Sequence, residues 1–127
     1  MRLLLDTQIF LWWLADSRKL AKATRERIEA ADEVYVSAAY IVECEAKIAA
    51  GLLEADAAEL AAGIRASGFL ELPVRARPAA AAGDLKPQPG VDFFDRLLVA
   101  QAMTEPLLFL TSNAALRGYS ELVEVAS

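Results

Sequence analysis

Histidine is missing from this chain of 127 residues. It is the usual general base of serine and cysteine hydrolases, and its imidazole is a common metal ligand. Its absence excludes Ser-His-Asp triads, Cys-His pairs and imidazole metal sites. Any catalysis must therefore use carboxylates, hydroxyls, amides, lysine, arginine or the single cysteine.

Cysteine and long apolar runs are also scarce. Cys44 is the only cysteine, which excludes an internal disulfide, and we expect it to be a small buried residue in a reducing compartment. No uncharged apolar stretch approaches the roughly 18 residues that span a bilayer. The apolar start of the chain resembles a secretory signal, but Asp6 interrupts it and no clear cleavage site follows. We therefore expect a cytoplasmic protein that binds no membrane.

Net positive charge is lacking as well. The chain has 13 lysines and arginines against 18 aspartates and glutamates, which gives a formal net charge of −5. This balance argues against a protein that holds nucleic acid mainly by bulk charge. It does not exclude a site that binds phosphate through metal ions.

Apolar residues, in contrast, make up 56% of the chain. This content and length predict one domain, residues 1–127, with a real core and with apolar surface to spare for an oligomer interface.

Short apolar runs predict buried strands at 2–5, 33–37, 69–74, 107–111 and 121–125. Capping residues and helical spacing predict helices from a cap at Asp6 or Thr7 to about Ala15, at 18–30, from the cap Ser37 to about Ala50, and at 54–66, 75–83 and 92–104, with a loop at 83–90. Strands that alternate with helices predict an α/β fold, a three-layer α/β/α sandwich around a parallel sheet.

Acidic side chains follow the predicted strands. Asp6 comes directly after the strand 2–5, and Glu43 lies in the helix after the second strand. Asp92 and Asp95 are neighbours on one helix face, and Asn113 follows the strand 107–111. Ligands of parallel sheets bind beyond the carboxyl ends of the strands, so we expect these residues to converge at that edge.

Each acid also has a purely structural interpretation. Asp6 and Asp92 are suited to be helix N-caps, where an anion contributes roughly 0.3–1 kcal/mol. Asp95 can be satisfied by a salt bridge to Arg96 or another arginine. Glu43 is harder to explain, because it lies on a helix that should be largely buried, where an unpaired carboxylate is costly.

A metal site explains all four acids together. Carboxylates that are forced together repel one another unless a cation neutralises them, and Mg²⁺ and Mn²⁺ prefer oxygen ligands. Such an ion can activate water and stabilise the charge that develops on a phosphodiester.

Four segments of the chain resemble the motifs of PIN-domain ribonucleases, and more narrowly those of the VapC toxins of toxin-antitoxin pairs. They are "LLLDTQIFLWWLAD", "VSAAYIVECEAKIAAGLL", "FFDRLLVAQAM" and "LTSN", in the order and spacing of the family. The resemblance implies a PIN-like α/β/α fold and an endoribonuclease that cuts tRNA or ribosomal RNA with Mg²⁺ or Mn²⁺. It assigns catalysis and metal binding to Asp6, Glu43 and Asp95, with Asp92 as a further ligand or an acid beside them. It also implies a homodimer and a VapB-type antitoxin.

The chain departs from the family pattern at three positions. Asn113 stands where the family commonly has Asp. An amide can orient a metal-bound water but contributes no negative charge, so a second metal ion should bind more weakly, if at all. Gln8 stands where many relatives carry His, and Val42 where they often carry Trp; neither change should abolish metal binding.

Contacts to substrate are less specific in the sequence. A basic stretch, Arg18, Lys19, Lys22 and Arg25, is suited to touch an RNA backbone, and equally to form an exposed helix face without a role. Arg96 is suited to hold a phosphate or to buffer the neighbouring acids. Hydroxyl groups that could donate hydrogen bonds near the metal, or serve only in caps and turns, are those of Thr7, Thr111 and Ser112.

Two other functions are compatible with parts of the pattern. A PIN-like module weakened at Asn113 could bind RNA or a protein without cutting. A phosphatase or receiver domain also places acids at strand ends, but it needs a lysine after a late strand, and "LLFLTSN" has none.

Overall fold

Five short strands form one sheet in the computed structural model, which describes residues 1–126. Every neighbouring pair of strands is parallel. In the order of the sheet the strands are β3 (Leu70–Leu72), β2 (Glu33–Ser37), β1 (Arg2–Leu5), β4 (Leu108–Thr111) and β5 (Val123–Val125). All carboxyl ends therefore lie at one edge of the sheet, which we call the carboxyl edge, and all amino ends at the other.

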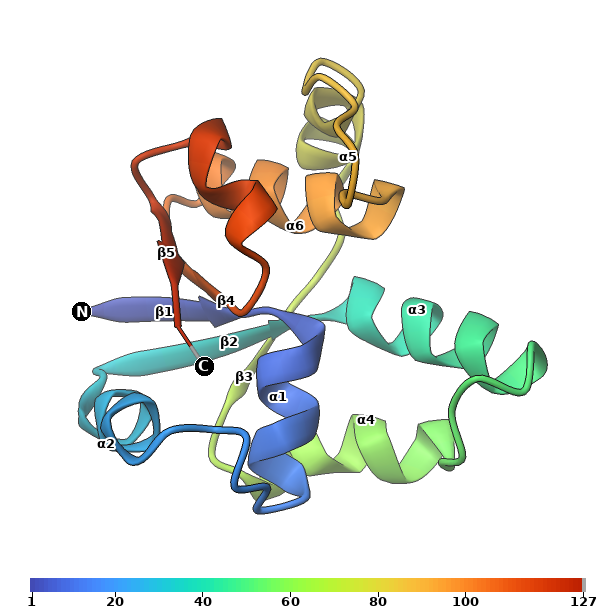
Figure 1. The fold of residues 1–127 in the computed structure, drawn as a ribbon, viewed down its shortest axis with the longest axis vertical. Helices are drawn as coiled ribbons and strands as arrows, with labels where there is room; N and C mark the ends of the chain where they lie inside the picture. The colour runs from blue at the N-terminus through green and yellow to red at the C-terminus, as the bar shows by residue number, and fades with distance from the viewer. Residues whose placement is uncertain (127) are drawn as a thin grey trace.

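Helices cover both faces of this sheet (Figure 1). On one face lie α1 (Thr7–Leu14), α2 (Lys22–Ala30), α3 (Ala38–Ala49) and α4 (Ala57–Ala66), and on the other lie α5 (Ala76–Ala82), α6 (Phe93–Thr104) and the 3₁₀ helix η1 (Ala114–Tyr119). The predicted three-layer α/β/α sandwich with a parallel sheet is confirmed. No helix within residues 1–126 is long and apolar enough to cross a membrane.

The sheet is buried on both faces, which explains the continuous apolar runs of its strands. Alternate side chains of β1 enter different cores. Leu3 and Leu5 pack with α1 to α4, whereas Leu4 packs with α6 and η1. Cys44 is fully buried in the first core, as expected for a small apolar residue.

Several predicted boundaries are wrong. The second helix begins at Lys22 rather than at residue 18, because Leu20 packs into the core from a turn in which Ser17 Oγ accepts a hydrogen bond from Lys19 N. The helix η1 was not predicted at all. The segments 54–56, 69, 73–74 and 121–122 lie outside the regular elements to which they were assigned.

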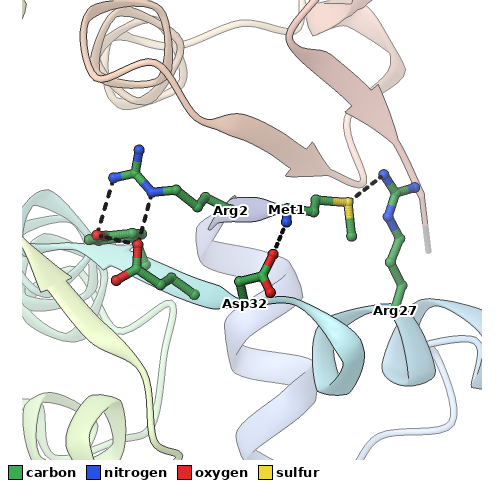
Figure 2. A network of polar contacts seen from close by, with 6 residues as sticks. Met1, Arg2, Arg27 and Asp32 are labelled. Atoms are coloured by element: carbon green, nitrogen blue, oxygen red, sulfur yellow. Dashed lines mark hydrogen bonds and ion pairs between the residues drawn. The ribbon is translucent and has the colours of Figure 1, made fainter.

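The amino edge of the sheet carries a network of paired charges (Figure 2). The main-chain nitrogen of Met1 pairs with Asp32, and Arg2 Nε lies 2.9 Å from Glu33 Oε1. Arg27 donates to Met1 Sδ at 3.6 Å and also forms an ion pair with Glu124. Opposite charges therefore alternate at this edge.

Candidate functional site

A pocket of about 280 Å³ opens at the carboxyl edge, where the strands β1 and β2 point toward the first turns of α1 and α3 (Figure 1). We call it the acidic pocket. Its lining residues come from four segments far apart in the sequence; they are Asp6, Thr7, Gln8, Leu11, Glu43, Lys47, Asp92, Asp95, Ser112 and Asn113. The four acids and the amide expected at this edge are thus brought together.

Asp6 is fixed by the end of β1 and the start of α1. Its Oδ1 accepts hydrogen bonds from Gln8 N at 2.6 Å and Ile9 N at 3.3 Å, and its Oδ2 accepts one from the hydroxyl of Thr111. Asp6 is therefore a helix N-cap and a wall of the pocket at once. Burial raises the pKa of Asp6 above its usual value and the charge of Glu43 adds to this, while the hydrogen bonds from Thr111 and the backbone oppose it.

Glu43 is held from two sides in a largely buried position. The helix that carries it starts at Ser37, whose Oγ accepts a hydrogen bond from Ala39 N at 3.0 Å. The hydroxyl of Thr7 donates to Glu43 Oε1 at 2.7 Å, and Lys47 Nζ lies 2.9 Å from Glu43 Oε2. Thr7 and Thr111 therefore donate to Glu43 and Asp6 respectively, which fixes the rotamers of both acids.

Asp92 and Asp95 form a capping box at the start of α6. Asp92 Oδ1 accepts a hydrogen bond from Asp95 N at 2.8 Å, and Asp95 Oδ2 accepts one from Asp92 N at 3.0 Å. Burial raises the pKa of Asp95 to about 6, and the negative charges of Asp92, Asp6 and Glu43 contribute, while the backbone hydrogen bond lowers it. The first turn of α6 thus points two carboxylates toward the first two acids.

A salt bridge does not explain Asp95. No arginine or lysine within residues 1–126 forms an ion pair with it. The guanidinium of Arg96 instead donates to the carbonyl oxygen of Leu85 at 3.4 Å and lies over the ring of Phe93. The alternative in which Arg96 or another arginine pairs with Asp95 is therefore wrong.

Asn113 has both ends of its amide engaged. Its Nδ2 donates to the carbonyl oxygen of Gly90 at 2.9 Å, and its Oδ1 accepts from Ala115 N at 3.0 Å. The side chain therefore joins the loop before α6 to the start of η1. Ser112 also lines the pocket.

The basic stretch lies outside this site. Neither Arg18 nor Lys19 lines the acidic pocket, and Lys22 pairs with Glu26. Arg25 pairs with Asp16 at 3.3 Å and lies over the ring of Trp13. The side chains of the stretch belong to the segment that leads to the amino edge of β2, away from the acids (Figure 1).

Lys47 is the pocket residue that the sequence analysis missed. Burial alone lowers the pKa of this lysine, but the hydrogen bond to Glu43 and the charges of Glu43, Cys44 and Asp92 outweigh it and raise the pKa above its usual value. The signal was present in the sequence, because residues four apart on a helix are neighbours. An i,i+4 lysine is nonetheless so common on exposed helices that the spacing alone did not point to a site.

The chemistry of the pocket fits a hard divalent cation. Asp6, Glu43, Asp92 and Asp95 supply carboxylate oxygens, and burial, together with the charges of the neighbouring acids, raises the pKa values of Asp6 and Asp95. As they stand, no three acids or thiols within residues 1–126 are gathered closely enough to ligate one ion. The residues that would hold such an ion are these four acids.

The model of the PIN domain family matches residues 3–122. The chain belongs to the PIN domain family. Members of this family are nucleases that generally use divalent metal ions. No protein among those with curated functions matches the sequence of this PIN domain.

Solved structures share the fold of this PIN domain. VapBC2 from Rickettsia felis, bound to a DNA fragment from its promoter, superposes with a TM-score of 0.69 at 14% sequence identity and covers 100% of both chains. A toxin-antitoxin complex from Klebsiella pneumoniae gives a TM-score of 0.68 at 17% identity and covers 96% of this chain and 95% of the other. At these identities the likeness shows the fold.

Proposed function

We propose that this PIN domain is a metal-dependent endoribonuclease and the toxin of a VapBC-type pair. The observation that carries the proposal is the acidic pocket, in which four carboxylates from α3 and from the starts of α1 and α6 line one cavity with a single lysine among them. Family membership supports nuclease chemistry, and the two toxin-antitoxin neighbours support the toxin role.

The ion is Mg²⁺ or Mn²⁺, and the residues that hold it are Asp6, Glu43 and Asp95, with Asp92 beside them. When bound, it supplies Lewis-acid stabilisation of the phosphodiester and lowers the pKa of a coordinated water. The chain orients two of these ligands before an ion binds, because Thr111 and Thr7 fix the carboxylates of Asp6 and Glu43. We assign both threonines to this positioning role, and Ser112 to the rim of the pocket.

One ion is the simplest stoichiometry for this pocket. The amide of Asn113 adds no negative charge, and both of its polar ends are used by Gly90 and Ala115. A second ion would meet no carboxylate at this position. Asn113 therefore acts by holding the loop in front of Asp92, rather than by orienting water.

The partners follow from the same assignment. The substrate is RNA, of the tRNA or ribosomal class, and the inhibitor is a VapB-type antitoxin. The protein acts in the cytoplasm as a homodimer, and the exposed side chains of Val42, Leu52 and Phe93 offer apolar surface for such contacts.

Cleavage of RNA by the purified protein tests the proposal. We expect cleavage with Mn²⁺ or Mg²⁺ that EDTA abolishes, and a loss of at least about 100-fold in Asp6→Asn, because a metal ligand should matter no less than the residues that orient one. Asp56→Asn is the matched control, since Asp56 also caps a helix, with its Oδ1 accepting from Ala58 N at 2.8 Å, but lies outside the pocket. Cleavage that survives EDTA, or an Asp6→Asn protein as active as the control, would overturn the proposal. Metal-dependent RNA binding without cleavage would show a binding module instead.

A further inference from the structure

Lys47 is the one basic residue that lines the acidic pocket within residues 1–126. Its Nζ lies 2.9 Å from Glu43 Oε2, while the other oxygen of Glu43 accepts from Thr7. Thr7 and Lys47 between them occupy the two carboxylate oxygens of Glu43. Lys47 is therefore paired with a carboxylate oxygen that a metal ion would also need.

This ion pair differs from an ordinary pair on a helix surface. Lys22 and Glu26 have the same i,i+4 spacing, but their charged groups are 3.9 Å apart and both side chains are mostly exposed. In the pocket, the side chain of Glu43 is only 11% exposed and that of Lys47 is 43% exposed. A charge pair of which one member is buried is screened less by solvent and interacts more strongly.

We propose that Lys47 is the resident cation of the acidic pocket, which a divalent ion displaces from Glu43 and which then binds a phosphate of the RNA substrate. The inference rests on the proposed function, because it concerns the same metal and the same substrate.

Displacement follows from charge and from the flexibility of lysine. Four carboxylates in one pocket repel one another, and the ammonium of Lys47 offsets part of that repulsion before a metal ion binds. An ion that binds Glu43 repels the ammonium of Lys47. It also neutralises the carboxylate charge that had attracted the ammonium. The four-carbon stem of Lys47 has several rotamers and is partly exposed, so the group can turn toward the mouth of the pocket.

The displaced ammonium of Lys47 offsets the repulsion between the acids and the phosphate of the substrate. A phosphodiester approaching this pocket faces four acids, and the arginines and lysines of the stretch 18–25 do not line it. Lysine binds phosphate as a point charge and tolerates several approach angles. Lys47 is therefore placed to compensate substrate charge at the point where the acids would otherwise repel it.

Calorimetric titration of Mn²⁺ tests the first half of the inference. We expect Lys47→Met to bind Mn²⁺ about three- to tenfold more tightly than the wild type, because the ion no longer competes with an ammonium. Lys47→Arg, which keeps the charge, should bind within about twofold of the wild type. Lys22→Met is the matched control, since it removes an equal charge from an equal spacing outside the pocket.

The second half is read from the KM for an RNA oligonucleotide. We expect Lys47→Met to raise KM and to lower the slope of log KM against log salt by about 0.7, the value for one lost phosphate contact on a single strand. A purely structural lysine would leave this slope unchanged.

The outcomes separate the inference from the proposed function. If the wild type binds Mn²⁺ and Lys47→Met binds it equally, or if the salt slope is unchanged, the inference fails while the proposed function stands. If neither protein binds Mn²⁺, the metal-dependent function fails and the inference with it. Tighter binding in Lys47→Met but not in Lys22→Met, together with the smaller slope, supports the inference.

Discussion

The carboxylate of Asp6 serves the fold and the site with the same two oxygens. Oδ1 accepts the first backbone N–H groups of α1, and Oδ2 accepts from Thr111 on β4. A cap needs only an acceptor, which Asn or Ser supplies equally well. An aspartate is required here only if its charge is used, and burial, to which the charge of Glu43 adds, makes that charge costly without a cation.

At the scale of single residues, the stability of the metal-free protein should depend on pH because the acids of the pocket are buried close together. The pKa of Asp95 rises from 3.8 to about 6 on folding, so the folded state binds the proton more tightly, and stability falls as pH rises from about 4 to about 6. In EDTA, Asp95→Asn should be more stable than the wild type at pH 7 by about 1 kcal/mol, after allowance for solvent screening. The amide can keep the hydrogen bond from Asp92 N.

Denaturant unfolding of both proteins between pH 4 and 7 measures this effect. The wild type should lose stability over that range and the variant should lose less. Parallel curves of unfolding free energy against pH for the two proteins would show that folding does not raise the pKa of Asp95.

The sequence predicted Asp6 because a carboxylate directly after a buried strand is a strong and local signal, whereas the other three acids were predicted from their helix positions and from the family resemblance. Asp6, Glu43, Asp92 and Asp95 were named for the edge at which the structure places them. For Arg25 the sequence left an RNA contact and an exposed helix face both open, because its pairing with Asp16 and Trp13 depends on a turn that brings distant side chains together. Lys47 was missed because its importance comes from the burial of Glu43 rather than from its own neighbours in the sequence.

At the scale of elements, the loop in front of α6 determines where two of the acids lie. Gly90 has a positive φ of 80°, its carbonyl oxygen accepts from Asn113, and Asp92 follows two residues later. Gly90→Ala should lower the free energy of unfolding by about 1–2 kcal/mol, because the left-handed conformation is unfavourable for a residue with Cβ. A Cβ there would meet only Ala115 Cβ at 3.8 Å, so the cost comes from the backbone and not from a clash.

Gly118→Ala is the control for this change. A Cβ at Gly118 meets nothing within 4 Å, and its φ is not positive, so the variant should be as stable as the wild type or slightly more so. Thermal unfolding of the two variants checks the prediction. Equal melting temperatures would show that the loop relaxes freely around residue 90.

The element boundaries that sequence analysis missed share a physical cause. The start of α2 was placed too early because Leu20 fits the apolar spacing of the helix, although it reaches the core from the preceding turn. The helix η1 depends on the cap from Asn113, whose side chain was considered only as a possible partner of metal-bound water. Leu20 and Asn113 each fit two local structures equally well in the sequence, and only the packing of the whole chain decides between those structures.

At the scale of the whole molecule, metal binding should stabilise the entire fold. The pocket joins α1, α3, α6 and the end of β4, so an ion bound there links helices from both faces of the sheet. Mn²⁺ at tenfold over its Kd should add about 1.4 kcal/mol, which corresponds to a rise in Tm of about 5 °C for a chain of this length.

Differential scanning calorimetry with Mn²⁺, compared with NaCl of equal ionic strength, measures this shift. The wild type should show one transition that moves upward with Mn²⁺ and returns in EDTA, whereas Asp6→Asn should shift much less. An equal shift in both proteins would place the ion elsewhere.

The hydrogen bond between Thr111 and Asp6 joins residues 105 positions apart, and β1 pairs in the middle of the sheet with a strand made a hundred residues later. Pairings between such distant segments form slowly. A ribosome that has made only the first hundred residues carries Asp6, Glu43 and Asp95 but not the strand that fixes Asp6. The order of synthesis therefore delays the complete site until the last fifth of the chain has been made.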